Sequence, residues 1–121
     1  MNQRILFFIY LGIVVFLSVS PWQINILSLF PDVLFSNYGF PQHVAGYFLL
    51  SLFACLTFTH IYPWWILSGI VVLGIVLECI QVAVPERSGN LYDLLGNILG
   101  VLLVAVFVFY RQLGEEKHAN K

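Results

Sequence analysis

Four long apolar stretches constrain the fold of this chain more than any other feature. They cover residues 5–20, 44–61, 64–84 and 91–110, and each is close to the roughly 20 residues that a helix needs to cross a bilayer. The stretches are continuously apolar, whereas strands of a membrane barrel are about 10 residues long and alternate apolar with polar side chains. The sequence therefore predicts an all-α integral membrane bundle of four transmembrane helices.

The composition agrees with a membrane protein. Hydrophobic residues make up 60% of the 121 residues, charged residues only 9%, and the mean hydropathy is +0.92. Arg4 before the first apolar stretch is typical of a signal peptide, but no small-x-small cleavage site clearly follows, so we expect this stretch to be retained as a helix. No repeat or linker divides the chain, which predicts a single domain over residues 1–121.

The few basic residues predict the orientation of the bundle. Arg4 precedes the first stretch, while Arg111, Lys117 and Lys121 follow the fourth. Because basic residues concentrate in cytoplasmic segments, both the N and C termini are expected to be cytoplasmic, which agrees with four crossings. The tail, residues 111–121, is short and mixed in charge, and we expect it to be solvated and partly disordered.

Three connections join the predicted helices. The inner connection, residues 60–65, is short and contains Pro63, so the second and third helices should form an antiparallel hairpin. The first outer connection, residues 21–42, is long and rich in aromatic side chains, and is expected to lie in the membrane interface. The second, residues 85–90, is expected to be a tight turn in which Asn90 caps the fourth helix.

Polar residues gather near the predicted outer face of this apolar bundle. Ionisable groups at membrane depth are costly, and they usually face protein or a water-filled cavity, where they pair with each other or with a ligand. Arg87 between Glu78 and Asp93 offers such a pairing. We therefore predict a ligand-binding site at this face. Its residues are His43, Tyr47, Glu78, Gln81, Arg87, Asp93 and Asn97.

Helical spacing brings several of these residues to shared faces. Glu78 and Gln81 are three residues apart and share one face of the third helix. Asp93 and Asn97 share a face of the fourth helix with a Gly-x-x-x-Gly motif, residues 96–100. Small residues at this spacing let a neighbouring helix approach closely.

Several of the same residues fall into ordered motifs. The motifs are His43-Val-Ala-Gly-Tyr47, Glu78-x-x-Gln81, Pro85-x-Arg87-Ser88 and Asp93-Leu-Leu-Gly-Asn97-x-x-Gly100. The last three closely resemble the signature of the VanZ-like membrane protein family, and the first resembles that family's motif at the start of its second helix. The similarity spans residues 42–101, about half of the chain.

The resemblance implies a small multipass protein of the bacterial inner membrane. The founding member of the family is associated with resistance to the glycopeptide antibiotic teicoplanin, although a resemblance alone does not carry this phenotype to another chain. Family members often have an Asp-Lys pair shortly before the histidine, whereas this chain has Gly39 and Phe40 there. The resemblance therefore supplies no lysine for binding an anion.

Each residue also has a purely structural interpretation. Glu78 and Arg87 could form an ion pair that fixes the hairpin of the third and fourth helices. Asp93 could stabilise the first turn of its helix, because it lies three residues after the predicted cap. Gln81 and Asn97 could form hydrogen bonds between helices, each worth about 0.6 kcal/mol on average.

No metal or cofactor is expected. His43 has no second ligand at a useful spacing and is more typical of an interfacial residue than of a metal ligand. Cys55 and Cys79 fall within different predicted helices and are expected to be packing residues. With a net charge of −1, the chain has no basic field for nucleic acid, and membrane lipids are the expected partners.

Three classes of function remain open. A binding module would hold the phosphate or carboxylate of an anionic lipid or lipid-linked cell-wall intermediate through Arg87 and His43. An enzyme acting on a phosphorylated lipid would use Glu78 or Asp93 as general base, but no nucleophile, metal set or cofactor loop supports this class. In a structural or assembly protein, the cluster would only fix helix packing. A proton or ion pathway is weaker, because polar residues do not continue through the inner half.

Overall fold

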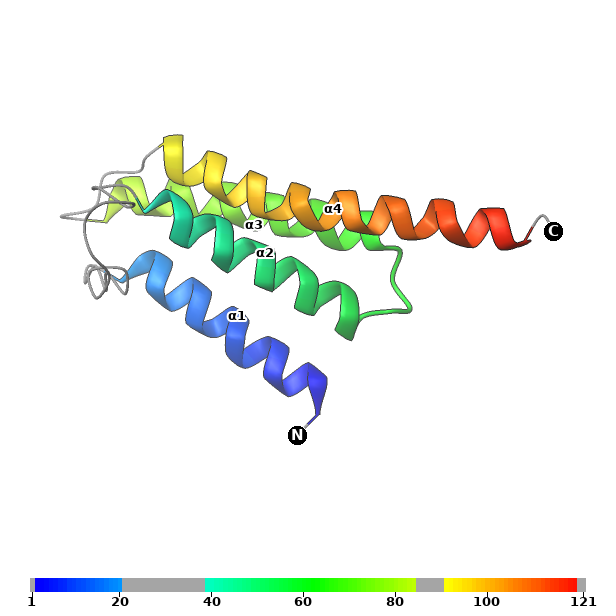
Figure 1. The fold of residues 1–121 in the computed structure, drawn as a ribbon. Coiled ribbons are helices and arrows are strands. Elements are labelled where there is room, and N and C mark those ends of the chain that lie inside the picture. The colour runs from blue at the N-terminus through cyan, green and yellow to red at the C-terminus, as the bar shows by residue number, and fades with distance from the viewer. Residues whose placement is uncertain (1, 21–38, 85–90, 120–121) are drawn as a thin grey trace, which may run out of the picture.

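The described part of the chain is helical apart from short connections. The structure is a computed structural model and describes residues 2–20, 39–84 and 91–119. Its helices are α1 (Gln3–Val19), α2 (Phe40–Thr57), α3 (Pro63–Ala83) and α4 (Leu91–Ala119) (Figure 1). The prediction of an all-α fold with four helices is confirmed over these residues.

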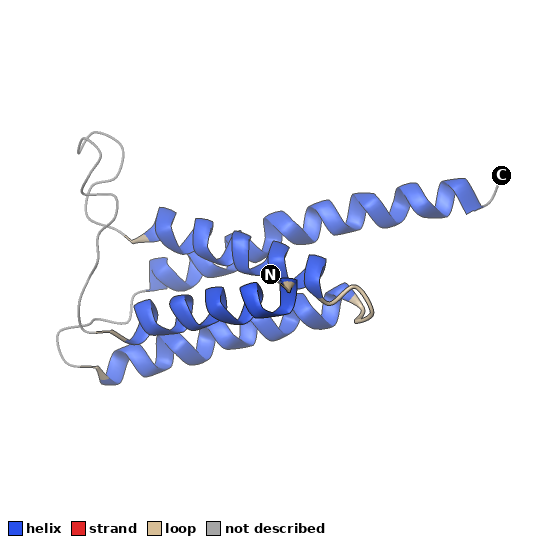
Figure 2. Ribbon diagram, turned by 90° about the horizontal axis from the view of Figure 1, so that it is seen from below, coloured by secondary structure: helices blue, strands red, loops and turns tan. Residues whose placement is uncertain are grey.

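Successive helices run in opposite directions, so the start of one helix lies beside the end of the next at each end of the bundle (Figures 1 and 2). The start of α1, the end of α4 and the connection between α2 and α3 lie at one end, which we call the terminal end. The end of α1, the start of α2, the end of α3 and the start of α4 lie at the other, which we call the polar end. The most extensive contact is between α2 and α4, while α1 packs on α2 and α3.

Large apolar side chains cover the outside of the bundle, and polar side chains lie inside it. Trp65 and Val82 are 75% and 71% exposed, whereas Glu78 and Asn97 are 7% and 3% exposed. This arrangement suits a lipid environment, because lipid solvates apolar side chains and excludes unpaired polar ones. α2, α3 and most of α4 are long and apolar enough to cross a membrane, and α1 is a shorter apolar helix. The chain is a membrane protein.

Two glycines bring α2 and α4 into close contact. A Cβ atom on Gly100 would lie 2.5 Å from the carbonyl oxygen of Val44, and one on Gly96 would lie 2.9 Å from that of Phe40. The absence of a Cβ at both positions lets the α4 backbone lie this close to α2. The close approach predicted from the Gly-x-x-x-Gly motif is therefore confirmed, and α2 is the helix that approaches.

α2 covers Phe40–Thr57 and not residues 44–61 as predicted. The prediction placed Pro41 in the connection, but proline fits the first helical turn, where its missing N–H would have no helical partner. At the other end, Phe58 has φ −108° and ψ 52°, which is outside the helical region. Pro63 then lies in the first turn of α3.

α4 continues to Ala119, so the prediction of a partly disordered tail is wrong for residues 111–119. This segment has no proline, and most of its residues, such as Gln, Leu, Glu and Lys, are good helix formers. Arg111 Nε also donates a hydrogen bond to Glu115 Oε1 at 3.0 Å. An exposed ion pair one turn apart adds about 0.3 kcal/mol of helix stability.

Two further predictions concern residues outside the described ranges. Residues 21–38 make up most of the first outer connection, and residues 85–90 make up the second. The interfacial placement of the first and the cap at Asn90 in the second stay predictions.

The close contact between α2 and α4 predicts that even an alanine side chain at position 100 destabilises the fold. In Gly100→Ala, the Cβ would meet the backbone of Val44 and Phe48, so the helices must separate, and we expect the free energy of unfolding to fall by about 1–3 kcal/mol. The control is Gly69→Ala in α3, where a Cβ would have no neighbour within 4 Å. Unfolding of both variants in detergent micelles measures the difference. Equal stability of the two variants would contradict this packing.

Candidate functional site

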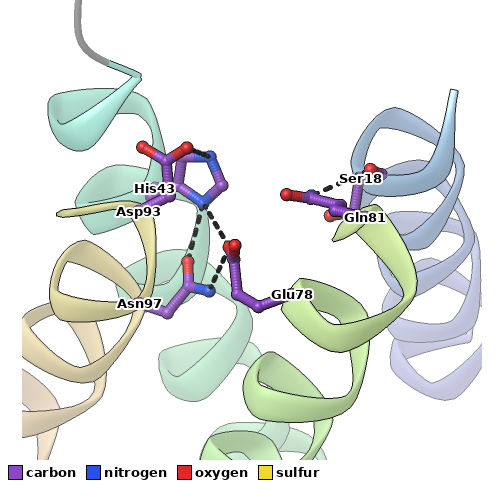
Figure 3. Close-up of polar contacts among 6 residues, drawn as sticks. All are labelled: Ser18, His43, Glu78, Gln81, Asp93 and Asn97. Carbon is purple, nitrogen blue, oxygen red and sulfur yellow. Dashed lines mark hydrogen bonds and ion pairs between the residues drawn. The ribbon is translucent and has the colours of Figure 1, made fainter. Parts of the chain in front are cut away.

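His43, Glu78, Asp93 and Asn97 converge inside the polar end of the bundle (Figure 3). His43 comes from α2, Glu78 from α3, and both Asp93 and Asn97 from α4. All four belong to the predicted site. We call these four residues the polar cluster.

The first turns of α2 and α4 position two residues of the polar cluster. The backbone N–H of His43 donates to the carbonyl oxygen of Gly39 at 3.0 Å, so the imidazole lies one turn into α2. Asp93 lies in the first turn of α4, where the helix dipole favours a negative charge. Gly39 lies against both side chains, since its Cβ would be 3.3 Å from His43 Cδ2 and 3.4 Å from Asp93 Oδ1.

The carboxamide of Asn97 joins two helices. Its Nδ2 donates a hydrogen bond to Glu78 Oε1 at 3.3 Å, and its Oδ1 lies 2.8 Å from His43 Nδ1. An amide oxygen can only accept, so His43 Nδ1 carries a proton and donates to it. Asn97 is 3% exposed, and hydrogen bonds in such a site are strong because water does not compete.

The imidazole of His43 lies between two carboxylates. Its Nδ1 is 3.9 Å from Glu78 Oε1, and its Nε2 is 3.8 Å from Asp93 Oδ2. Both distances are too long for a hydrogen bond, but each would be an ion pair if the ring carries a positive charge. The side chains of His43 and Asp93 keep 18% and 17% of their surface exposed, so the polar cluster is open at the polar end.

Tyr47 lies one turn deeper along α2 than His43. The residue is 2% exposed, and its hydroxyl has no hydrogen-bond partner among the described residues. A Cβ on Gly74 would be 3.4 Å from both this hydroxyl and Asn97 Nδ2. Gly74 of α3 therefore leaves the space in which the Tyr47 ring packs beneath the polar cluster.

Gln81 is buried but lies apart from the polar cluster (Figure 3). Its Nε2 donates a hydrogen bond to the backbone oxygen of Ser18 in α1 at 2.8 Å. This bond between helices attaches α1 to α3, which is the structural role that the sequence allows for Gln81. Glu78 and Gln81 therefore share one face of α3 but contact different helices, since Glu78 accepts from α4 and Gln81 donates to α1.

The remaining residues singled out in the sequence are Arg87, Cys55 and Cys79. Arg87 lies outside the described residues. Cys55 is partly buried and Cys79 is exposed, and both are free thiols. Within residues 2–20, 39–84 and 91–119, no group of three His, Cys, Asp or Glu side chains is arranged to hold a metal ion.

Three contributors to the site were missed in the sequence. In the sequence, Gly39 stands out only as a departure from a family motif, and Gly74 is given no role in the site. Ser18 acts through its backbone oxygen, so its side chain gives no signal. The glycines matter because they leave room for His43 and Tyr47, which depends on the packing of neighbouring helices.

The polar cluster contains groups that can form hydrogen bonds and exchange protons. Its carboxylates and amide oxygen are hydrogen-bond acceptors, and its donors are imidazole and amide N–H groups. The arrangement therefore offers both donors and acceptors of hydrogen bonds near the polar end. Comparison of the chain with protein-family models, curated proteins and solved structures finds no match.

Proposed function

We propose that this chain is a VanZ-like membrane protein that binds the headgroup of a lipid or lipid-linked cell-envelope component at its polar end. The observation that carries the proposal is the polar cluster, in which a buried carboxylate, a partly buried carboxylate and a partly buried histidine lie among apolar helices. Ionisable groups inside a membrane destabilise a fold unless they are paired, and they mark functional sites. Its opening at the polar end supports a ligand that enters there.

An apolar groove supports a lipid as the ligand. It is an open groove of about 420 Å³ between α2 and α4, lined only by apolar residues. Phe40 and Val44 line it, and they flank His43 along α2. A lipid that lies along this groove has its headgroup near the level of the polar cluster, and the groove provides apolar contact for one acyl chain.

Arg87 and His43 are the residues we assign to the anionic part of the headgroup. Arginine binds phosphate through charge-assisted, bidentate hydrogen bonds. Arg87 is assigned from the sequence, and His43 because its imidazole lies at the opening of the polar cluster. The resemblance to the VanZ-like family extends this proposal to the bacterial inner membrane and to glycopeptide susceptibility.

We further propose that all four helices cross the membrane and that both termini are cytoplasmic. The basic residues Arg4 and Arg111 both lie at the terminal end, which agrees with the positive-inside rule. Reporter fusions to each terminus test this orientation. Cytoplasmic activity is expected for both, and one terminus reporting from outside would rule out four crossings.

A structural role is the second candidate. The hydrogen bonds from Asn97 to Glu78 and from His43 to Asn97 join α2, α3 and α4, so the polar cluster contributes to packing whether or not a ligand binds. The two functions differ in what happens when Arg87 is removed, because a packing role through the predicted ion pair of Arg87 with Glu78 requires the fold to weaken.

Lipid retention by an arginine variant tests the binding function. We expect wild-type protein, purified gently, to retain a specific anionic lipid in native mass spectrometry. Arg87→Ala should retain about tenfold less, because a hydrogen bond to a charged group contributes about 1.5–3 kcal/mol. The control is Arg111→Ala, which removes the same side chain from an exposed site at the terminal end.

The melting temperature of each variant separates the two functions. Loss of lipid from an Arg87→Ala protein that melts like the wild type would support binding. If the wild type retains no specific lipid and the Arg87→Ala protein no longer folds, the result would contradict binding and support the structural role.

A further inference from the structure

The exposed tyrosine and tryptophan side chains of the described segments lie toward the two ends of the bundle. They are Tyr62, Trp65, Tyr92 and Tyr110, and each keeps between 57% and 75% of its surface exposed. Tyr62 is the N-cap of α3, and Trp65 lies in the first turn of that helix, so both are at the terminal end. Tyr92 lies in the first turn of α4, at the polar end.

Tyrosines away from the ends are turned inward. Tyr47 of α2 is buried, while Tyr10 of α1 is half-buried and donates a hydrogen bond from its hydroxyl to the carbonyl oxygen of Gly46 at 3.2 Å. The hydrocarbon core offers no partner for an exposed hydroxyl or indole N–H, so such groups are costly there. This distribution is expected of a surface that contacts hydrocarbon in its middle and polar groups at each end.

Tyr110 lies at the same level as Trp65, although α4 continues beyond it. α3 and α4 are packed antiparallel, with Trp65 lying 18 residues before Ala83 and Tyr110 lying 19 residues after Leu91. At 1.5 Å per residue, each ring is roughly 27–29 Å from the polar end. Tyr62, Trp65 and Tyr110 therefore lie in one band at the terminal end, which we call the terminal belt.

α4 changes in character at the level of the terminal belt. Residues 94–110 contain no charged side chain, whereas Arg111 and Glu115 beyond them are exposed and form an ion pair. The helix extends past the connection between α2 and α3 (Figures 1 and 2). Aromatic side chains followed by charged ones are typical of the point at which a helix leaves the membrane. The exposed side chains between Tyr92 and Tyr110 are all apolar, namely Leu95, Leu99, Leu102, Leu103, Val106, Phe107 and Phe109.

From these observations we infer that the terminal belt binds the interfacial region of one lipid leaflet and that Tyr92 lies in the interface of the other. The rings of tyrosine and tryptophan suit this region because their apolar bodies contact acyl chains while the hydroxyl or indole N–H reaches polar lipid atoms. The section from Tyr92 to Tyr110 is about 27 Å of helix, close to the roughly 30 Å hydrocarbon core of a bilayer. Residues 111–119 then form a helix in water.

This lipid-binding surface goes beyond the proposed function, because it involves no residue of the polar cluster and holds whether or not a ligand binds there. It also gives the depth of the polar cluster. Asp93 follows Tyr92 directly and therefore lies at the level of the interface, whereas Asn97 lies one helical turn deeper, within the hydrocarbon section.

Cysteine labelling along α4 tests where this helix leaves the membrane. Full-length protein with Cys55→Ser and Cys79→Ser receives one new cysteine, either Leu103→Cys or Leu113→Cys, and is reconstituted in vesicles with a polar maleimide on both sides. Both leucines are exposed positions of the same helix, so neither change disturbs the packing. We expect the cysteine at position 113 to react about tenfold faster or more, because maleimide attack requires a thiolate, which forms in water. Equal rates, or an unreactive position 113, would overturn the boundary at Tyr110.

Fluorescence quenching tests the terminal belt itself. With Trp22→Phe and Trp64→Phe, Trp65 is the single tryptophan, and we expect lipids brominated near the headgroup to quench it more than lipids brominated near the acyl-chain end. The control replaces Trp65 by Phe as well and adds Leu102→Trp, an exposed position midway along the hydrocarbon section, where the order of quenching should reverse. Stronger quenching of Trp65 by the deep bromines, or the same order in both proteins, would overturn the inference. Loss of the proposed lipid ligand from the polar cluster would leave both results unchanged.

Discussion

The placement of ionisable side chains among apolar helices is the constraint on which the rest of this structure depends. The hydrocarbon core offers neither water nor counter-ions, so Glu78 and His43 must find partners within the bundle. Asn97 provides these partners from α4, because one carboxamide both accepts from His43 and donates to Glu78. Three helices are thereby joined at the polar end, and the carboxylate of Asp93 lies at its opening.

Close packing makes this arrangement possible. Gly96 and Gly100 let α4 lie against the α2 backbone, which brings Asn97 within hydrogen-bond distance of His43. Gly74 on α3 provides the space for Tyr47 beneath the same contact. The small residues therefore have a role in the site as well as in the fold, and α1 is attached separately through Gln81.

Much of the fold and part of the site could be predicted from the sequence. Apolar stretches of helical length predicted the four helices, and the Gly-x-x-x-Gly motif predicted a close helix contact. Helix ends were less predictable, since Pro41 suits a first turn as well as a connection. Periodicity placed Glu78 and Gln81 on one face but could not show that Gln81 contacts α1, because the choice of neighbour depends on how the helices are arranged.

The coupling between His43 and Asn97 tests the central claim most directly. It is measured as a double-mutant cycle, from the free energies of unfolding of His43→Ala, Asn97→Ala and the double variant. We predict a coupling energy of about 0.6–1.7 kcal/mol, the range found for hydrogen bonds between membrane helices. The control cycle of His43→Ala with Gln81→Ala should be additive within about 0.5 kcal/mol. A coupling between His43 and Asn97 no larger than this control would contradict the account.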